Sequence, residues 1–263
     1  THGVTLRLAL FDRRRDTSEV FRDFRAGIAG MTGVLTEQHP EVAVAHRDYA
    51  IALMRQGRVT EAFREAAICD RIQRTHFLGL VRSLGENEAL LYSRQRLNGV
   101  HLMSWAASRG NDPFQHRLAY DATVRSRLLL FDELAARRQL GSSPGSRAAE
   151  LEREVGRVNS SLTRLVQRGV AGESRETYDQ RLSVMRASRD SLRALLLAST
   201  PSAGRVYAGA EAGLDSVLAS RGKDVALVSY ATVRVPTATG DLRFYGAFVV
   251  PPRSRQPVFV RLA

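Results

Sequence analysis

The chain has 263 residues, a formal net charge of +12 and 44% hydrophobic residues, which is enough apolar material for one large or two ordinary globular domains. No apolar run approaches the roughly 20 residues that span a bilayer, and the first residues lack the hydrophobic block and cleavage site of a signal peptide. These features exclude a membrane protein and favour a soluble, globular one. Because the sequence begins at Thr1, an export signal further upstream stays open.

Cysteine and histidine usage argues against a metal site. Cys69 is the only cysteine, so the chain can form no internal disulfide and no multi-cysteine zinc site. This favours a reducing, cytoplasmic compartment. The histidines show no His-x-x-x-His pair or other ligand spacing, and no glycine-rich phosphate loop follows a strand. We therefore expect no metal and no cofactor. The histidines are His2, His39, His46, His76, His101 and His116.

The positive charge comes almost wholly from arginine, since Lys223 is the only lysine. Clustered basic residues are typical of proteins that bind nucleic acid or another polyanion. Here the arginines are spread out and alternate with acidic residues, as in AAELEREVGRV, which is typical of solvated helix faces. An Arg-rich coiled coil that binds a polyanion is the alternative function. A single stripe of arginines would favour it, and acidic residues on every face would argue against it.

Apolar residues recur at helical spacing from Asp16 to Leu35, and two further helices meet at Gly57 within residues 41–74. The two helices that meet at Gly57 are predicted to form a tight hairpin, because glycine lets the chain turn where two helices diverge. Its pattern resembles one tetratricopeptide repeat (TPR), in which small side chains let two helices approach closely. A single repeat must stack on neighbouring helices to bury its apolar face. The residues that carry the resemblance are Ala50, Leu53, Gly57, Ala62, Ala66 and Cys69.

Further helices are predicted over 72–110, 114–140, 147–168 and 175–197, and a short one over 208–220 after the STPSAG segment. The helix at 147–168 has apolar residues at alternating steps of four and three, which is the seam of a coiled coil. Short Gly- and Ser-rich connections make consecutive helices antiparallel. We therefore expect a coiled-coil hairpin or small bundle. The seam residues are Leu151, Val155, Val158, Leu162 and Leu165.

From Val225 the apolar pattern changes to the period of two that is typical of strands. Strands are predicted at DVALVSYATVRV, LRFYGAFVV and PVFVRLA, with a hairpin loop in which Gly240 takes a positive φ. Three strands with no helix to cover them would leave an apolar face in water. The sequence therefore predicts that the sheet belongs to a larger fold, and that this segment alone self-associates.

These strands are similar to the opening strands of CHAT domains, the caspase-like domains that follow TPR arrays in bacteria. In that family a short helix ending in leucine leads into strands of the ALVEY and YxAFV types. The matching positions here are Leu218, Ala226 to Tyr230 and Tyr245 to Val249, with Ser229 where the family commonly has an acidic residue. The resemblance covers the chain from about residue 40 to its end.

The resemblance implies that the catalytic His and Cys of a caspase-like cysteine peptidase follow later strands of this sheet, outside the present sequence. Within the sequence, Cys69 and His76 lie seven residues apart, and an activated cysteine needs a neighbour that lowers its pKa. A cysteine at a small-residue position of a TPR is usually a core residue. We therefore expect no catalytic residue in this chain.

The predicted fold class is mainly α, with a TPR-like hairpin, long antiparallel helices and a C-terminal β-meander that begins an α/β caspase-like sheet. The predicted domains are the end of a TPR-like array (1–74), a connecting helix with an antiparallel bundle (75–200) and the start of a CHAT domain (201–263). The predicted function is a non-catalytic interaction and scaffold segment of a TPR-CHAT protein. A free-standing helical adaptor is a third hypothesis, against which the unfinished sheet argues.

The predicted partners are a protein or peptide and the remainder of the CHAT domain, with neither nucleic acid nor membrane. The predicted contact surface is the concave, helix A side of the repeat, which in a TPR array receives the partner. Its residues are His46, Arg47, Tyr49 and Leu53.

Overall fold

The computed structural model describes residues 17–81, 98–127, 146–170, 172–199, 213–237 and 240–262. Helices take up 69% of these residues and a three-stranded antiparallel sheet follows them, which confirms the mainly α class with a terminal meander. The predicted helical segments at 82–97, 128–140 and 208–212 lie outside the described residues. The elements are α2 (Thr17–Leu35), α3 (Pro40–Arg55), α4 (Val59–Val81), α6 (Asn98–Ala107), α7 (Pro113–Arg127), α9 (Arg147–Arg168), α10 (Arg175–Ser199), α12 (Leu214–Ala219), β1 (Leu227–Thr237), β2 (Gly240–Val250) and β3 (Val258–Arg261).

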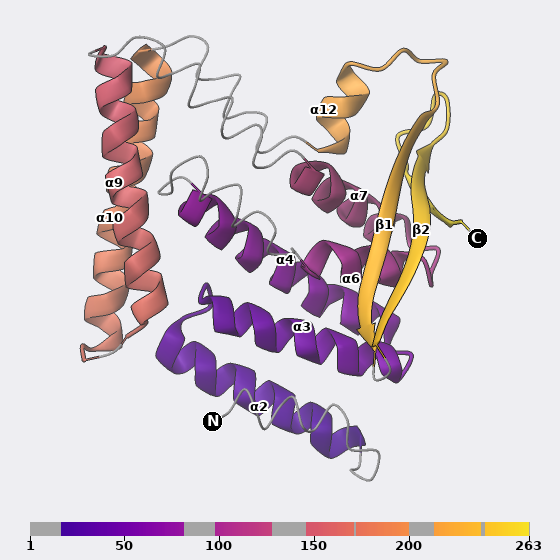
Figure 1. The fold of residues 1–263 in the computed structure, drawn as a ribbon, viewed down its shortest axis with the longest axis horizontal. Helices are drawn as coiled ribbons and strands as arrows, with labels where there is room; N and C mark the ends of the chain where they lie inside the picture. Colours follow the sequence, from indigo (N-terminus) through magenta and orange to yellow (C-terminus); the bar gives the residue numbers. More distant parts are fainter. Residues whose placement is uncertain are drawn as a thin grey trace.

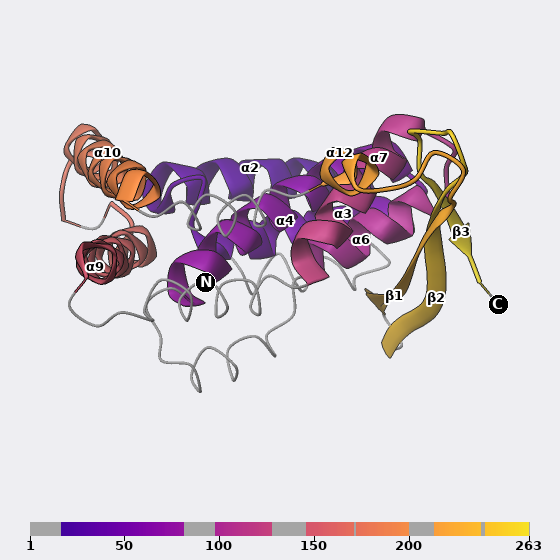
Figure 2. The same cartoon turned by 90° about the horizontal axis from the view of Figure 1, so that it is seen from above.

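The paired helices α9 and α10 lie at one end of the molecule and the sheet lies at the other (Figure 1). Between them, α2, α3 and α4 pack in succession, and α6 and α7 separate α4 from the strands. The view from above shows the same order from α10 to β3 (Figure 2). The helical layers therefore form a support on which the sheet is mounted.

Helices α3 and α4 form the predicted hairpin. Gly57 turns the chain between them with a φ of 71°, a conformation that a residue with a Cβ rarely adopts. Ala50, Ala62 and Ala66 have no exposed surface, so small side chains do lie where the two helices pack together. The hairpin and its turn are therefore confirmed.

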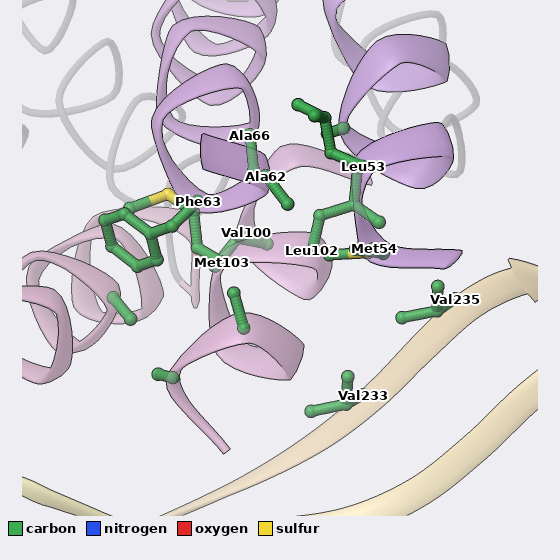
Figure 3. Packing of buried hydrophobic residues seen from close by; sticks show 14 of the residues in the cluster. Leu53, Met54, Ala62, Phe63, Ala66, Val100, Leu102, Met103, Val233 and Val235 are labelled. Atoms are coloured by element: carbon green, nitrogen blue, oxygen red, sulfur yellow. The ribbon is translucent and has the colours of Figure 1, made fainter. Parts of the chain in front are cut away.

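A single apolar core connects this hairpin to the sheet. It includes Leu53 and Met54 of α3, Leu102 of α6, and Val233 and Val235 of β1. In Figure 3 the two valines project from β1 toward the helices that carry Leu102 and Met54. The core therefore runs across the predicted domain boundaries at residues 74 and 200.

Helices α9 and α10 form an antiparallel coiled-coil pair. Leu151, near the start of α9, packs with Leu196, near the end of α10, and Leu165 packs with Tyr178 where the two helices are joined. This confirms the hairpin and its seam. The helix predicted at 114–140, of which the structure describes α7, packs instead on α6 in the main core. The described part of the coiled coil therefore consists of two helices.

The α9–α10 pair is attached to the turn between α2 and α3 through polar contacts. His39, the N-cap of α3, accepts a hydrogen bond at Nδ1 from the Glu41 amide, which leaves Nε2–H to donate to the Gln167 carbonyl at 3.0 Å. Nearby, the Val170 amide donates to the Val34 carbonyl at 3.1 Å. Because these bonds involve backbone groups at the ends of helices, they fix where the pair sits.

The sheet is a meander in the order β1-β2-β3, with each neighbouring pair antiparallel. Gly240 has the expected positive φ, at 133°. The inner face of the sheet is buried through Val233, Phe244, Phe248 and Phe259, and it packs on α6 and α7. The expectation that no helix of this chain covers the strands is therefore wrong for this face, because the distant helices α6 and α7 supply the cover.

Candidate interaction surface

The opposite face of the sheet, which we call the outer face, carries exposed apolar side chains. Successive side chains of a strand point to opposite faces, and the register sets Tyr230 beside Ala247, which in turn lies beside Val260. The side chain of Tyr230 is 69% exposed and that of Tyr245 is 63% exposed. The apolar residues of the outer face are Val228, Tyr230, Tyr245, Val249, Val258 and Val260, together with Ala247, which is 3% exposed between Tyr230 and Val260.

The free edge of β1 is bonded to helices of the same chain. Arg127, the last residue of α7, donates to the Tyr230 carbonyl, and His101 of α6 hydrogen-bonds to the Thr232 backbone. Burial lowers the pKa of His101, and the hydrogen bond to Thr232 opposes this shift. An exposed strand edge is a site for strand addition. Since α6 and α7 occupy these backbone groups, the outer face is a more accessible surface for a partner than this edge.

Helix α12 connects the sheet to α7. The buried carboxylate of Asp121 accepts a hydrogen bond from the Leu214 amide at 2.7 Å and so caps the start of α12. On the surface, Asp215 of α12 pairs with Arg117 of α7 and with Arg255 of the β2–β3 turn, at 2.6 and 3.0 Å. Exposed pairs contribute at most about 1 kcal/mol, so the buried cap is the stronger attachment. Together these contacts hold the sheet in one orientation on the helices.

Ser229, which departs from the CHAT pattern, lies on the inner face of β1. It is 8% exposed, and its hydroxyl lies 3.5 Å from that of Tyr120. An acidic side chain at this position would be buried against α7, where an unpaired charge is costly. Serine therefore suits the packing in this chain.

Two of the four predicted contact residues belong to the core. Leu53 has no exposed surface and Tyr49 is 4% exposed, with its ring stacked on Phe24 of α2 at a centroid distance of 5.2 Å. The sequence showed the apolar stripe of the first helix, but it did not show that α2 would pack on the side of α3 that carries Tyr49.

The other two predicted contact residues have acidic partners within the chain. Nδ1 of His46 lies 2.6 Å from the Glu65 carboxylate, and Arg47 pairs with Asp48 at 2.7 Å. All four side chains lie on α3, but the structure does not bring them together on an exposed face. In contrast, the sequence does contain a signal for the apolar outer face. The strands have apolar residues at both odd and even positions, so apolar side chains lie on both faces of the sheet.

Cys69 is a core residue of α4. It has no exposed surface and packs with Val42, Ala43 and Ile72. Burial, with a contribution from the neighbouring Asp70 carboxylate, raises the pKa of its thiol to about 12. The thiol therefore stays protonated at neutral pH and is a poor nucleophile.

Arginines on the α9–α10 pair are interleaved with acidic residues. Arg175 pairs with Asp179 one turn along α10, and Glu173 pairs with both Arg168 and Arg181. Arg147, Arg157 and Arg189 also have acidic partners. This interleaving is the arrangement that argues against a polyanion-binding stripe.

Comparisons with protein-family models, with curated proteins and with solved structures returned no match. None of the described helices is long and apolar enough to cross a bilayer. Across the same described residues, no three or more His, Cys, Asp or Glu side chains are grouped so as to hold a metal ion.

Proposed function

We propose that this chain is a non-catalytic helical interaction and scaffold segment of a TPR-CHAT protein. In this role, α2 to α7 support the first strands of a caspase-like sheet, and the remainder of that domain packs on the outer face. The observation that carries the proposal is the asymmetry of the sheet, whose inner face packs on α6 and α7 while its outer face exposes several large apolar side chains.

Covering the outer face of the sheet would be energetically favourable. Burying one Val or Tyr side chain that was exposed contributes roughly 1.5–3 kcal/mol, so a covering layer over the outer face would gain several such contributions at once. Scattered exposed apolar residues are normal, whereas a contiguous patch marks an interaction site. Tyr230 of β1 and Val260 of β3 are both exposed and lie on either side of Ala247 of β2, which is 3% exposed between them.

The proposal assigns no chemistry to this chain. The buried, protonated thiol of Cys69 is unsuited to attack a peptide bond. In the CHAT resemblance, the catalytic His and Cys belong to other strands of the same sheet. A reading frame in which a His and a Cys each follow an apolar strand C-terminal to β3 would support the proposal, and a stop codon directly after Ala263 would contradict it.

The triple variant Tyr230→Thr, Tyr245→Thr, Val260→Thr is expected to abolish self-association of the 263-residue chain. The parental chain should bind a hydrophobic dye and sediment as oligomers, because its outer face is open, while the variant sediments as a monomer with an unchanged helical circular-dichroism spectrum. Threonine keeps the strand preference of these positions, so the fold is retained.

A matched control is Val34→Thr, Phe114→Thr, Val184→Thr, which removes three apolar side chains that are 61–67% exposed but lie on separate helices. This control should associate as the parental chain does. A parental chain that is monomeric and binds no dye would contradict the proposed role of the outer face.

A further inference from the structure

A small pocket with both apolar and polar lining lies where α9 and α10 meet α4 and the turn before α3. It has a volume of about 70 Å³, and since one water needs about 10–15 Å³, it has room for several waters or for one oxyanion. Its polar lining comes from three helices that are distant in the sequence and from the turn before α3, and Leu162, Val166 and Leu182 form its apolar side. The polar lining residues are Gln38 of the turn, Thr75 and His76 of α4, Asn159 and Thr163 of α9, and Arg186 and Arg189 of α10.

Asn159 brings an unpaired buried donor to the lining of this pocket. Its side chain is 5% exposed, and its amide nitrogen finds no acceptor among the described residues. Leaving a buried donor without a partner costs about 1–3 kcal/mol, which is why such groups usually have a partner in the folded protein. A hydrogen-bond acceptor bound in the pocket would remove this cost.

The charged groups of the pocket are cationic. Arg186 donates to the Gln38 side-chain carbonyl at 2.6 Å, and Arg189 uses Nε and Nη2 to bind Asp190. Asp190 is itself 61% exposed and is not among the lining residues, none of which is acidic. An anion would therefore meet two guanidinium groups and no carboxylate within the pocket.

His76 adds a neutral hydrogen-bond donor to the lining of the pocket. Burial lowers its pKa, and the nearby His39 lowers it further, so His76 is neutral at pH 7 and can donate one hydrogen bond. The lining thus combines neutral donors with two cations, which is the complement of a small oxyanion that has several acceptor atoms.

We propose that this pocket binds a phosphate group, with the Asn159 amide as the directional donor and Arg186 and Arg189 as the source of charge. A tetrahedral oxyanion can accept from α4, α9 and α10 at once. Its binding would therefore lock the coiled-coil pair onto the repeat region. This site lies at the opposite end of the molecule from the outer face (Figure 1), so its test is independent of the proposed function.

Thermal unfolding of the 263-residue chain, followed by circular dichroism, tests the proposal. Inorganic phosphate is titrated at constant pH and constant ionic strength, with chloride as the balancing anion, because diffuse attraction to a basic protein is screened by salt. We expect a saturable rise in Tm with phosphate and no comparable rise with acetate. Methyl phosphate distinguishes the source: an equal rise assigns the site to a phosphoryl group on a larger molecule, and no rise assigns it to the free ion.

Two variants identify the pocket as the site. Arg189→Gln should weaken phosphate binding about 10- to 100-fold, the loss expected for a charge-assisted hydrogen bond. Asn159→Leu should abolish the phosphate effect and at the same time raise the Tm of the ligand-free chain, because it removes the unpaired donor. A merely structural asparagine would give a lower Tm instead.

The matched control is Arg157→Gln, which makes the same change in charge at a side chain that is 77% exposed on α9. It should keep the parental affinity for phosphate. The proposal is overturned if phosphate gives no saturable rise in the parental chain, if acetate raises Tm as much as phosphate does, or if Arg189→Gln and Arg157→Gln respond equally.

Discussion

Gly99→Ala is expected to lower the free energy of unfolding by about 3 kcal/mol or more, the upper end of the usual cost of overpacking. A Cβ at Gly99 would lie 2.4 Å from the backbone nitrogen of Asp70 and 2.5 Å from its Cα. These are backbone atoms within α4, so no side-chain rotation can relieve the clash. Helix α6 would have to move away from α4, which disrupts the core that supports the sheet. Urea denaturation measures the loss.

Gly30→Ala is the matched control and should have the opposite sign. Gly30 lies inside α2, and apart from its chain neighbours and the nearby backbone of α2 no atom lies within 4 Å of the position its Cβ would take. Alanine in the interior of an exposed helix is more stable than glycine by about 1 kcal/mol. Equal changes in the free energy of unfolding for the two substitutions would contradict the close packing of α6 on α4 at Gly99.

The close approach at Gly99 illustrates what the sequence could not predict. Periodicity identified the α3–α4 hairpin, the coiled-coil pair and all three strands, because those signals depend on residues close together in the chain. It carried no signal that α6 packs directly on α4 at Asp70, since that contact depends on a specific interhelical geometry. The cover over the inner face of the sheet was missed for the same reason.

The candidate sites differ in the same way: local sequence patterns indicated some of them, and others arise only from contacts between distant helices. The period-two pattern of the last strands predicted a sheet with an apolar face, and the structure shows that α6 and α7 cover the inner face. The choice of His46, Arg47, Tyr49 and Leu53 depended on an open helix A side, and packing of α2 buries part of that side. Asn159 was hidden among the polar residues of a coiled-coil helix, because its burial arises only when α9 meets α4.

These placements suggest a specific use for the TPR-like hairpin within the proposed function. In a repeat array, the face that α2 and α6 pack against would be shared with neighbouring repeats. Here α6 extends that stacking toward β1, so the hairpin supports the sheet through a continuous apolar core. In this arrangement α6 contacts both helices of the hairpin and β1.

Stability is expected to contain a component that decreases as the pH rises from about 4 to about 6, with Asp70 as its cause. Burial raises the pKa of Asp70 from 3.8 to about 6, against the attraction of the Arg74 and Arg125 guanidinium groups. Its Oδ1 has no donor among the described residues. Because the pKa is higher in the folded state than in the unfolded state, the component is complete below pH 3.8 and is lost as the pH passes 6. A shift of this size corresponds to about 3 kcal/mol.

Asp70→Asn isolates this component, since asparagine stays neutral throughout. The variant should match the parental chain near pH 4 and exceed its free energy of unfolding by about 3 kcal/mol near pH 7. Ordinary carboxylates change stability in the other direction over this range, so the measurement is the difference between variant and parent in urea denaturation at each pH. Asp224→Asn removes an exposed carboxylate that pairs with Arg253 and should leave the difference near zero. A variant that is less stable than the parent at pH 7 would show that Arg74 and Arg125 hold Asp70 ionised, and that its charge supports the contact between α4 and α7.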